Sequence, residues 1–302
     1  MGTSRAGDLQ PTHEYHAEAH ALSGHVDLPV SQKIYKLAAV ELSDWRGGHN
    51  SQRNDHYNLE GIISFKSGYT HVSGNPSMKE GHGWVTLATS VLEGLNVLDV
   101  ITADRITAQV STEHPLKNGY VPHVTFLGTR FENLRVSGYE VKLELDLEFC
   151  GSKPDGDISY LQNANFLDRV ERQHAQIVSA PELPRNTKAE YDKELSNLRE
   201  IKAQCKGSGQ GTGNERKVKC SLVKSIEPIP VAKTYGNILE IPGFGIVSLA
   251  DLHVGTKPIE DPQSSHPYSH YFTLAMINMR MGCIGEGMVS GAGVTANGHT
   301  RP

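Results

Sequence analysis

Residues 84–112 read W-V-T-L-A-T-S-V-L-E-G-L-N-V-L-D-V-I-T-A-D-R-I-T-A-Q-V-S-T, and residues 121–147 read V-P-H-V-T-F-L-G-T-R-F-E-N-L-R-V-S-G-Y-E-V-K-L-E-L-D-L. Both blocks are rich in Val, Ile, Leu, Thr and Phe, most of which favour extended strands. Pro115, Gly119 and Pro122 lie around the junction and predict a loop. This region therefore predicts a body built mainly of β-strands.

Alternation of apolar and polar residues indicates individual strands. In residues 141–149 every second residue is apolar and the others are Lys, Glu or Asp, which predicts a strand with one buried and one solvated face. In residues 15–21, Tyr and Ala alternate with His and Glu in the same way. Residues 59–72 predict a strand pair or a bent strand. Further strands are expected at 34–42, 220–226, 236–241, 245–254 and 270–281.

A helical hairpin is predicted at about 160–205. Apolar residues recur at helical spacing in residues 163–179, and Thr187, with Glu190 three residues later, has the pattern of a capping box that starts a second helix. Residues 205–219 are Gly-rich and predict a flexible loop. We therefore expect a disordered arm at 1–14 and one domain at 15–302: mainly β, with an antiparallel sandwich-like or β-helix-like body and an inserted helical hairpin.

Three segments share the form x-x-Leu-polar-Val, at 93–97, 132–136 and 250–254. Similar strands stack readily in one sheet, although five-residue matches are too short to establish a repeat. The tail after Gly282 is rich in Gly, Ser and Ala.

Composition excludes several classes of function. The net charge is −5 and the pI is near 6.3, so the protein is not expected to have the basic surface that nucleic-acid binding needs. The sequence contains no apolar run of 18 residues, so no transmembrane helix is expected. The first 25 residues contain no apolar core of a signal peptide, which predicts a cytoplasmic protein if Met1 is the native start. Four cysteines, Cys150, Cys205, Cys220 and Cys283, form no C-x-x-C pair and are expected to be reduced and mostly buried.

Motifs of nucleophilic or phosphate chemistry are absent from the sequence. Residues 207–213 read G-S-G-Q-G-T-G, which lacks the G-K-[ST] ending of a phosphate loop and precedes a strand rather than a helix. No Ser lies in a G-x-S-x-G turn between a strand and a helix.

Histidine offers the one candidate for chemistry. His16 and His20 share a face of the first expected strand, and His49 and His56 lie in the polar segment 44–58, which predicts a long loop. If these four converged, they would bind a divalent metal. The alternative is a solvated strand face and an ordinary surface loop.

The segments 94–108 (G-L-N-V-L-D-V-I-T-A-D-R-I-T-A) and 129–138 (T-R-F-E-N-L-R-V-S-G) resemble the core of the choice-of-anchor P family. The resemblance implies a β-rich bacterial surface or secreted protein, and it implies no catalytic residues. We therefore expect a non-enzymatic structural or interaction protein that binds a protein partner or self-associates through its sheet edges. The alternative is a metal-binding protein, or a metal-dependent enzyme, with a site at His16, His20, His49 and His56.

Overall fold

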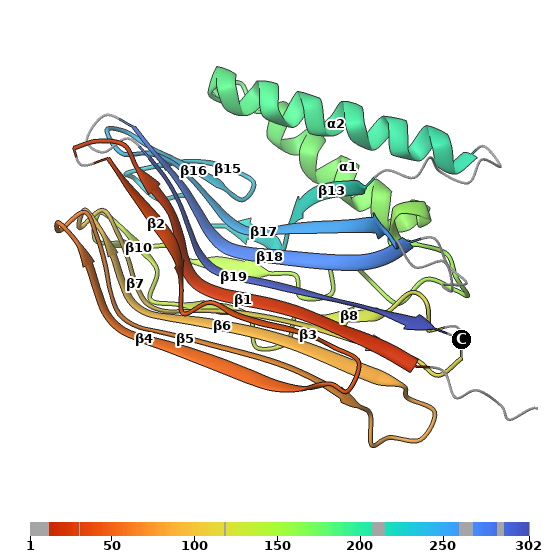
Figure 1. Cartoon of the computed structure of the whole chain (residues 1–302). Coiled ribbons are helices and arrows are strands. Elements are labelled where there is room, and N and C mark those ends of the chain that lie inside the picture. Colours follow the sequence, from red (N-terminus) through yellow and green to blue (C-terminus); the bar gives the residue numbers. More distant parts are fainter. Residues whose placement is uncertain are drawn as a thin grey trace, which may run out of the picture.

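Two antiparallel sheets pack face to face around one apolar core in the computed structural model, which describes residues 12–29, 31–117, 119–206, 215–259, 268–282 and 287–301. Strands β1, β18 and β19 of the first sheet lie over β5, β6 and β7 of the second (Figure 1). The prediction of a mainly β, antiparallel, sandwich-like body is confirmed.

The first sheet has the order β15-β16-β17-β18-β19-β1-β2, with β13 beside β17 and β3 beside β1. Its strands are β1 (Thr12–Val26), β2 (Gln32–Leu37), β3 (Val40–Asp44), β13 (Arg216–Ser221), β15 (Lys233–Tyr235), β16 (Ile238–Ile241), β17 (Gly245–Pro258), β18 (Tyr268–Met281) and β19 (Gly287–Arg301).

The second sheet has the order β11-β10-β7-β6-β5-β4, with β8 and β9 also paired to β7. Its strands are β4 (Gly48–Leu59), β5 (Ile63–Pro76), β6 (Trp84–Val97), β7 (Ile101–His114), β8 (His123–Thr125), β9 (Arg130–Glu132), β10 (Arg135–Val136) and β11 (Tyr139–Glu140). A third, two-stranded sheet joins β12 (Leu143–Leu145) to β14 (Val223–Ile226).

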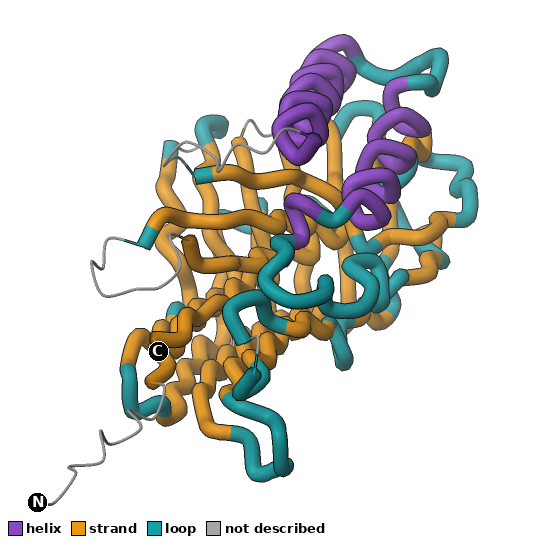
Figure 2. The backbone as a smooth tube through the Cα atoms, turned by 90° about the vertical axis from the view of Figure 1, so that its right-hand side faces the viewer, coloured by secondary structure: helices purple, strands orange, loops and turns teal. Residues whose placement is uncertain are grey.

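The helices pack together over the outer face of the first sheet, next to β13 (Figure 2). A 3₁₀ turn, η1 (Tyr160–Gln162), leads into α1 (Ala164–Val178), and α2 (Arg185–Lys206) follows. The Asn163 side chain caps α1 by accepting a hydrogen bond from the Phe166 amide. Within the described residues, neither helix is long and apolar enough to cross a membrane.

The capping prediction for α2 is wrong. The helix begins at Arg185, and the amide of Lys188 donates to the Pro184 carbonyl at 2.8 Å. Thr187 therefore lies inside the first turn, where its side chain is buried.

Strand β1 buries Tyr15, Ala17, Ala19 and Ala21, as its alternation predicted. It starts at Thr12 rather than Tyr15, because its first residues pair with the end of β19. The rest of the expected arm lies outside the described residues, as does the middle of the expected Gly-rich loop, residues 207–214; the end of that loop is the start of β13.

The expected loop 44–58 is instead mostly strand β4, at the edge of the second sheet. It pairs with β5 from Gly48 to Leu59, yet nearly all its side chains are exposed or half-buried. Both of its faces contact water, so no apolar alternation marks it in the sequence. Backbone pairing alone defines this strand.

The tail rich in small residues forms β19, which lies between β1 and β18. Its small residues make room for histidines of the adjacent strand. A side chain at Gly293 would overlap the ring of His20, and one at Gly298 would overlap the ring of His13. This requirement for space explains why a central strand has a composition typical of a loop.

The strand predicted at 141–149 is much shorter in the structure. Only Leu143–Leu145 form a ladder, with β14, and a turn begins at Asp146. Asp146 defines this turn: its carbonyl accepts from the Phe149 amide, and its side chain accepts from the Glu148 amide at 3.1 Å. Local hydrogen bonds therefore end the strand despite its regular alternation.

A crease crosses the first sheet. One row of residues is left unpaired across β17, β18, β19 and β1, namely Ala250, Met276, Ala292 and Ala21. The strand register is the same on both sides of this row. Ala250 and Ala292 have φ of 49° and 50°, in the left-handed region. Each long strand changes its buried face here: β17 buries Val247 and Leu249 before the crease, and Leu252 and Val254 after it.

The second sheet has a similar feature, at His56, Lys66, Gly94 and Asp104, where β5 and β6 also lack the neighbouring pair Phe65 and Leu95. His56 and Gly94, on alternate strands, have φ of 58° and 65°. The strands bend together in Figure 1, and β5 is one bent strand, as one of the two alternatives for residues 59–72 predicted. The three x-x-Leu-polar-Val segments each contain a left-handed residue, Gly94, Asn133 or Ala250, so the shared pattern marks a change of backbone direction.

Candidate functional site

A cavity of about 420 Å³ lies between α2 and the outer face of the first sheet. Small-molecule sites in proteins have volumes of this order. Strands β1, β13 and β16 to β19 form its floor and walls, and the first turns of α2 close one side. Its lining is Ser23, Gly24, His25, Thr187, Glu190, Tyr191, Lys219, Ile238, Ile246, Ser248, Asp251, His253, Asn278, Met279, Arg280, Met288, Val289 and Ser290.

The crease in β17 creates the polar end of this cavity. In a regular strand, Ser248 and Asp251 would point to opposite faces, because they are three residues apart. The left-handed Ala250 between them reverses the alternation, so both face outward, and Ser248 Oγ donates to Asp251 Oδ2 at 2.8 Å. The backbone conformation of one alanine thus brings the two side chains together.

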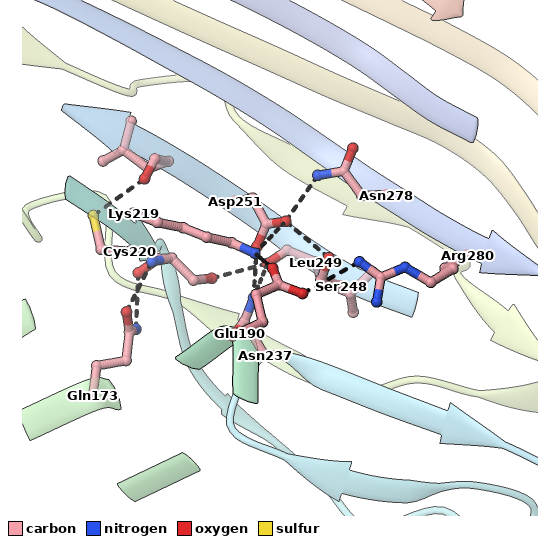
Figure 3. A network of polar contacts seen from close by, with 12 residues as sticks. Gln173, Glu190, Lys219, Cys220, Asn237, Ser248, Leu249, Asp251, Asn278 and Arg280 are labelled. Atoms are coloured by element: carbon pink, nitrogen blue, oxygen red, sulfur yellow. Dashed lines mark hydrogen bonds and ion pairs between the residues drawn. The ribbon is translucent and has the colours of Figure 1, made fainter. Parts of the chain in front are cut away.

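Asp251 is the centre of the polar network in Figure 3. Its Oδ2 also accepts from Asn278 Nδ2 at 2.8 Å, and its Oδ1 accepts from Asn237 Nδ2 at 2.9 Å. The residue is only 5% exposed, so these neutral donors replace the water it has lost.

Lys219, on β13, connects this centre to the helix. Its Nζ lies 3.0 Å from Glu190 Oε1 and 3.9 Å from Asp251 Oδ2, and it lies over the ring of Tyr191. Arg280 Nη2, on β18, donates to the other Glu190 oxygen at 3.2 Å. Glu190 therefore ties α2 to two strands of the sheet, as Figure 3 shows.

The network continues towards α1 and supplies hydrogen-bond donors to a backbone carbonyl at the crease. Ser221 Oγ and Asn237 Nδ2 both donate to the Leu249 carbonyl, at 2.8 and 3.2 Å. Gln173, on α1, bonds the backbone of Ser221 in both directions. The helical insertion and the crease are thus held by one set of hydrogen bonds.

The neighbouring charges in the cavity stabilise the ionised forms of Lys219 and Glu190. Burial opposes the charge of Lys219, but Asp251, Tyr191 and Glu190 outweigh burial and raise the pKa of the ammonium group above its ordinary value. Burial also opposes the charge of Glu190, yet Lys219 and Arg280 lower the pKa of that carboxyl group overall. Burial lowers the pKa of His253, which favours a neutral imidazole.

The four histidines of the metal hypothesis occupy two different sheets. His16 and His20 lie on β1, whereas His49 and His56 lie on the edge strand β4. All four are described residues, and no three of them place their donor atoms within 4.8 Å of one another. The His20 ring lies over Gly293 and shares a hydrogen bond with Ser23 at 3.1 Å. His49 lies 6.4 Å from His71, measured between ring centroids.

One of the four does have suitable neighbours. Among the described residues, donor atoms of His16, Glu18 and Glu41 lie within 4.8 Å of one another. Glu18 follows His16 by two residues on β1, and Glu41 is directly opposite Glu18 on β3. Lys36 Nζ also binds Glu18, at 3.1 Å.

Two of the four cysteines are free thiols in the core, as expected: Cys150 and Cys220. Burial raises the pKa of both thiols, which makes them poor nucleophiles. Cys283 and the side chain of Cys205 lie outside the described residues.

Sequence reasoning missed the cavity, although it noted several of its residues for other reasons. Thr187 and Glu190 had the pattern of a helix cap, and Asp251 and His253 belong to one x-x-Leu-polar-Val segment. A usable signal was present: two polar residues at alternate positions in the otherwise apolar stretch 249–254. Such residues in a strand covered on both faces require polar partners.

The model of a family described as a domain of unknown function, DUF8256, matches residues 13–255, so the chain belongs to this family. The match includes Glu190, Lys219, Asp251 and His253, whereas Asn278 and Arg280 on β18 lie beyond it. No curated protein and no solved structure matches the chain. These comparisons do not bear on the resemblance to the choice-of-anchor P family, which stays a prediction.

Proposed function

We propose that this protein is a non-enzymatic binding protein that holds a small molecule in the cavity between α2 and the first sheet. The observation that carries the proposal is the cavity itself: about 420 Å³, lined by both polar and aliphatic side chains. Concave sites with a few oriented polar groups on an apolar wall are typical of ligand binding.

The charged groups of the cavity favour binding over catalysis. A lysine nucleophile needs a lowered pKa, but the pKa of Lys219 is raised by its carboxyl neighbours. A general acid needs a raised pKa, but the pKa of Glu190 is lowered by Lys219 and Arg280. Burial, acting with nearby carboxyl groups, also raises the pKa of the Tyr191 hydroxyl. These groups are arranged to stay in one protonation state.

A fragment screen by ligand-observed NMR tests the proposal. We expect several fragments to bind the parent protein and to compete with one another. Ile246 lines the cavity and is half-buried, so Ile246→Trp should fill the space and abolish this shared binding. Leu127→Trp, at a position that is 68% exposed and outside the cavity lining, is the matched control and should keep it. Binding that survives Ile246→Trp unchanged would contradict the proposal.

Divalent-metal binding is a second candidate function, supported by the group His16, Glu18 and Glu41. One imidazole and two carboxylate groups are ligands that zinc accepts in proteins. Calorimetry with ZnCl₂ should show one site per chain, weakened at least tenfold by Glu41→Gln. The control Glu132→Gln, on β9, should leave the affinity unchanged. Equal affinity in both variants would reject this site.

Self-association through a sheet edge stays a prediction, and β4 is the edge that fits it best. The strand is 12 residues long and exposed for most of its length. An unpaired edge of this kind can pair with a second copy. Light scattering over a range of protein concentrations should detect dimers, and Gln52→Pro should remove them. A monomer at every concentration would contradict the prediction.

A further inference from the structure

The charged side chains that line the cavity balance one another. Lys219 and Arg280 are cationic, Glu190 and Asp251 are acidic, and contacts of 3.0 to 3.9 Å join Lys219 to both acids and Arg280 to Glu190. Removing an ion from water without a counter-ion is strongly unfavourable. An anionic or cationic ligand would therefore bring a charge that the cavity leaves unmatched.

The remaining polar lining includes the hydroxyl groups of Ser23, Ser248 and Ser290, which carry no charge. A hydroxyl group can donate one hydrogen bond and accept two, so an uncharged polar group of a ligand can bind it. The Oγ1 of Thr187 also has no hydrogen-bond partner among the described residues, but it is fully buried and does not face the cavity.

The lining also contains the aliphatic side chains of Ile238, Ile246 and Met288, whereas the side chains of Met279 and Val289 belong to the core between the sheets. This wall suits an apolar ring or chain. One water molecule occupies about 30 Å³ of the liquid, so a cavity of about 420 Å³ has room for roughly ten to fifteen non-hydrogen atoms. The ligand is thus small, with one polar and one apolar side.

We infer that the cavity selects an uncharged amphipathic molecule whose hydroxyl or carbonyl group binds the uncharged polar lining and whose apolar part packs on the aliphatic side chains. This inference rests on the proposed function, because it assigns the ligand class of the same cavity. The polar network then has a distinct role: it holds α2 at a fixed distance from the sheet and keeps the cavity electrically neutral.

Three probes of nearly equal size test the charge selection: cyclohexylmethanol, cyclohexanecarboxylate and cyclohexylmethylamine. Their affinities are measured by saturation-transfer NMR at pH 7.5, with the parent protein and Ile246→Trp. We expect the alcohol to bind at least tenfold more tightly than either ion, and only when the cavity is open. Tighter binding of the carboxylate or the amine would overturn the ligand class while leaving the proposed function intact. Failure of all three probes together with the fragment screen would overturn the proposed function itself.

Discussion

At the scale of single residues, the left-handed Ala250 has the widest consequences. It reverses the alternation of β17 and so places Ser248 and Asp251 on one face. An L-residue in this conformation is strained by about 1–2 kcal/mol, and glycine is not.

Ala250→Gly and Ala296→Gly should therefore affect stability differently, although both alanines are fully buried. At Ala250, relief of strain offsets the lost methyl group, and we expect the free energy of unfolding to change by less than about 0.5 kcal/mol. At Ala296, φ is not in the left-handed region, so the substitution relieves no strain. The lost methyl group and the greater backbone freedom of glycine should then lower the free energy of unfolding by about 1–2 kcal/mol. Urea unfolding measures both, and equal losses would contradict the role given to Ala250.

Buried histidines should make the protein sensitive to acid. Burial lowers the pKa of His13 to about 2 and that of His114 to about 4, and neighbouring histidines contribute to both shifts. Between pH 6.5 and 4 the unfolded chain therefore binds more protons than the folded protein at these positions. The contribution of these neutral histidines to stability is fully present above pH 6.5. It is lost as the pH falls to about 4, and the loss from His114 is on the order of 3 kcal/mol.

His114→Phe isolates this effect. It should destabilise the protein at pH 7.5, because the ring no longer donates Nδ1–H to the Gly119 carbonyl. The difference from the parent should shrink as the pH falls to 5, since phenylalanine does not titrate. Urea unfolding at pH 7.5, 6 and 5 checks it, and a difference that is constant with pH would refute the assignment.

The periodicity of the sequence correctly predicted which side chains of a regular strand are buried. Tyr15, Ala17 and Ala19 were expected on one face of β1 and are buried there. It did not predict the site, because the face to which Asp251 points depends on the dihedral angle of its neighbour. Apolar periodicity contains no information about a single left-handed residue, and Asn278 joins Asp251 only through long-range strand pairing.

At the scale of elements, α2 and β13 are joined by a largely buried ion pair. The Lys219 side chain is 15% exposed and binds Glu190, whereas the Lys224 side chain is 60% exposed and binds Glu144. Loss of one partner from a buried pair leaves an uncompensated charge, and exposed pairs contribute little.

Lys219→Met should therefore lower the free energy of unfolding by about 3–5 kcal/mol, and Lys224→Met should have a much smaller effect. Both replacements keep a long apolar side chain, so packing changes little. Chemical unfolding followed by circular dichroism compares them. Similar small losses in the two variants would mean that the Lys219 network does not hold the helix to the sheet.

Elements were predictable where one face is apolar and the other polar. Both helices were found, and so was the body of β17. The sequence of β4 resembles a loop because water contacts both of its faces, and that of β19 resembles a loop because histidine rings occupy the space above its glycines. The position of a strand at a sheet edge and the space that neighbouring side chains require both depend on tertiary structure. The pattern of residues along one strand therefore does not predict them.

At the scale of the whole molecule, the two sheets and the helical hairpin have different tasks. The two sheets share one core, and each sheet has one crease. The hairpin rests on the outer face of the first sheet and closes the cavity against it. We expect ligand binding to raise the free energy of unfolding by an amount that grows with ligand concentration.

The most direct test of the proposed binding function is a crystal structure of the protein soaked with cyclohexylmethanol. The account predicts electron density for the alcohol between α2 and the first sheet, with its ring against Ile246 and Met288. Alcohol found only elsewhere on the protein, with this cavity empty, would contradict it.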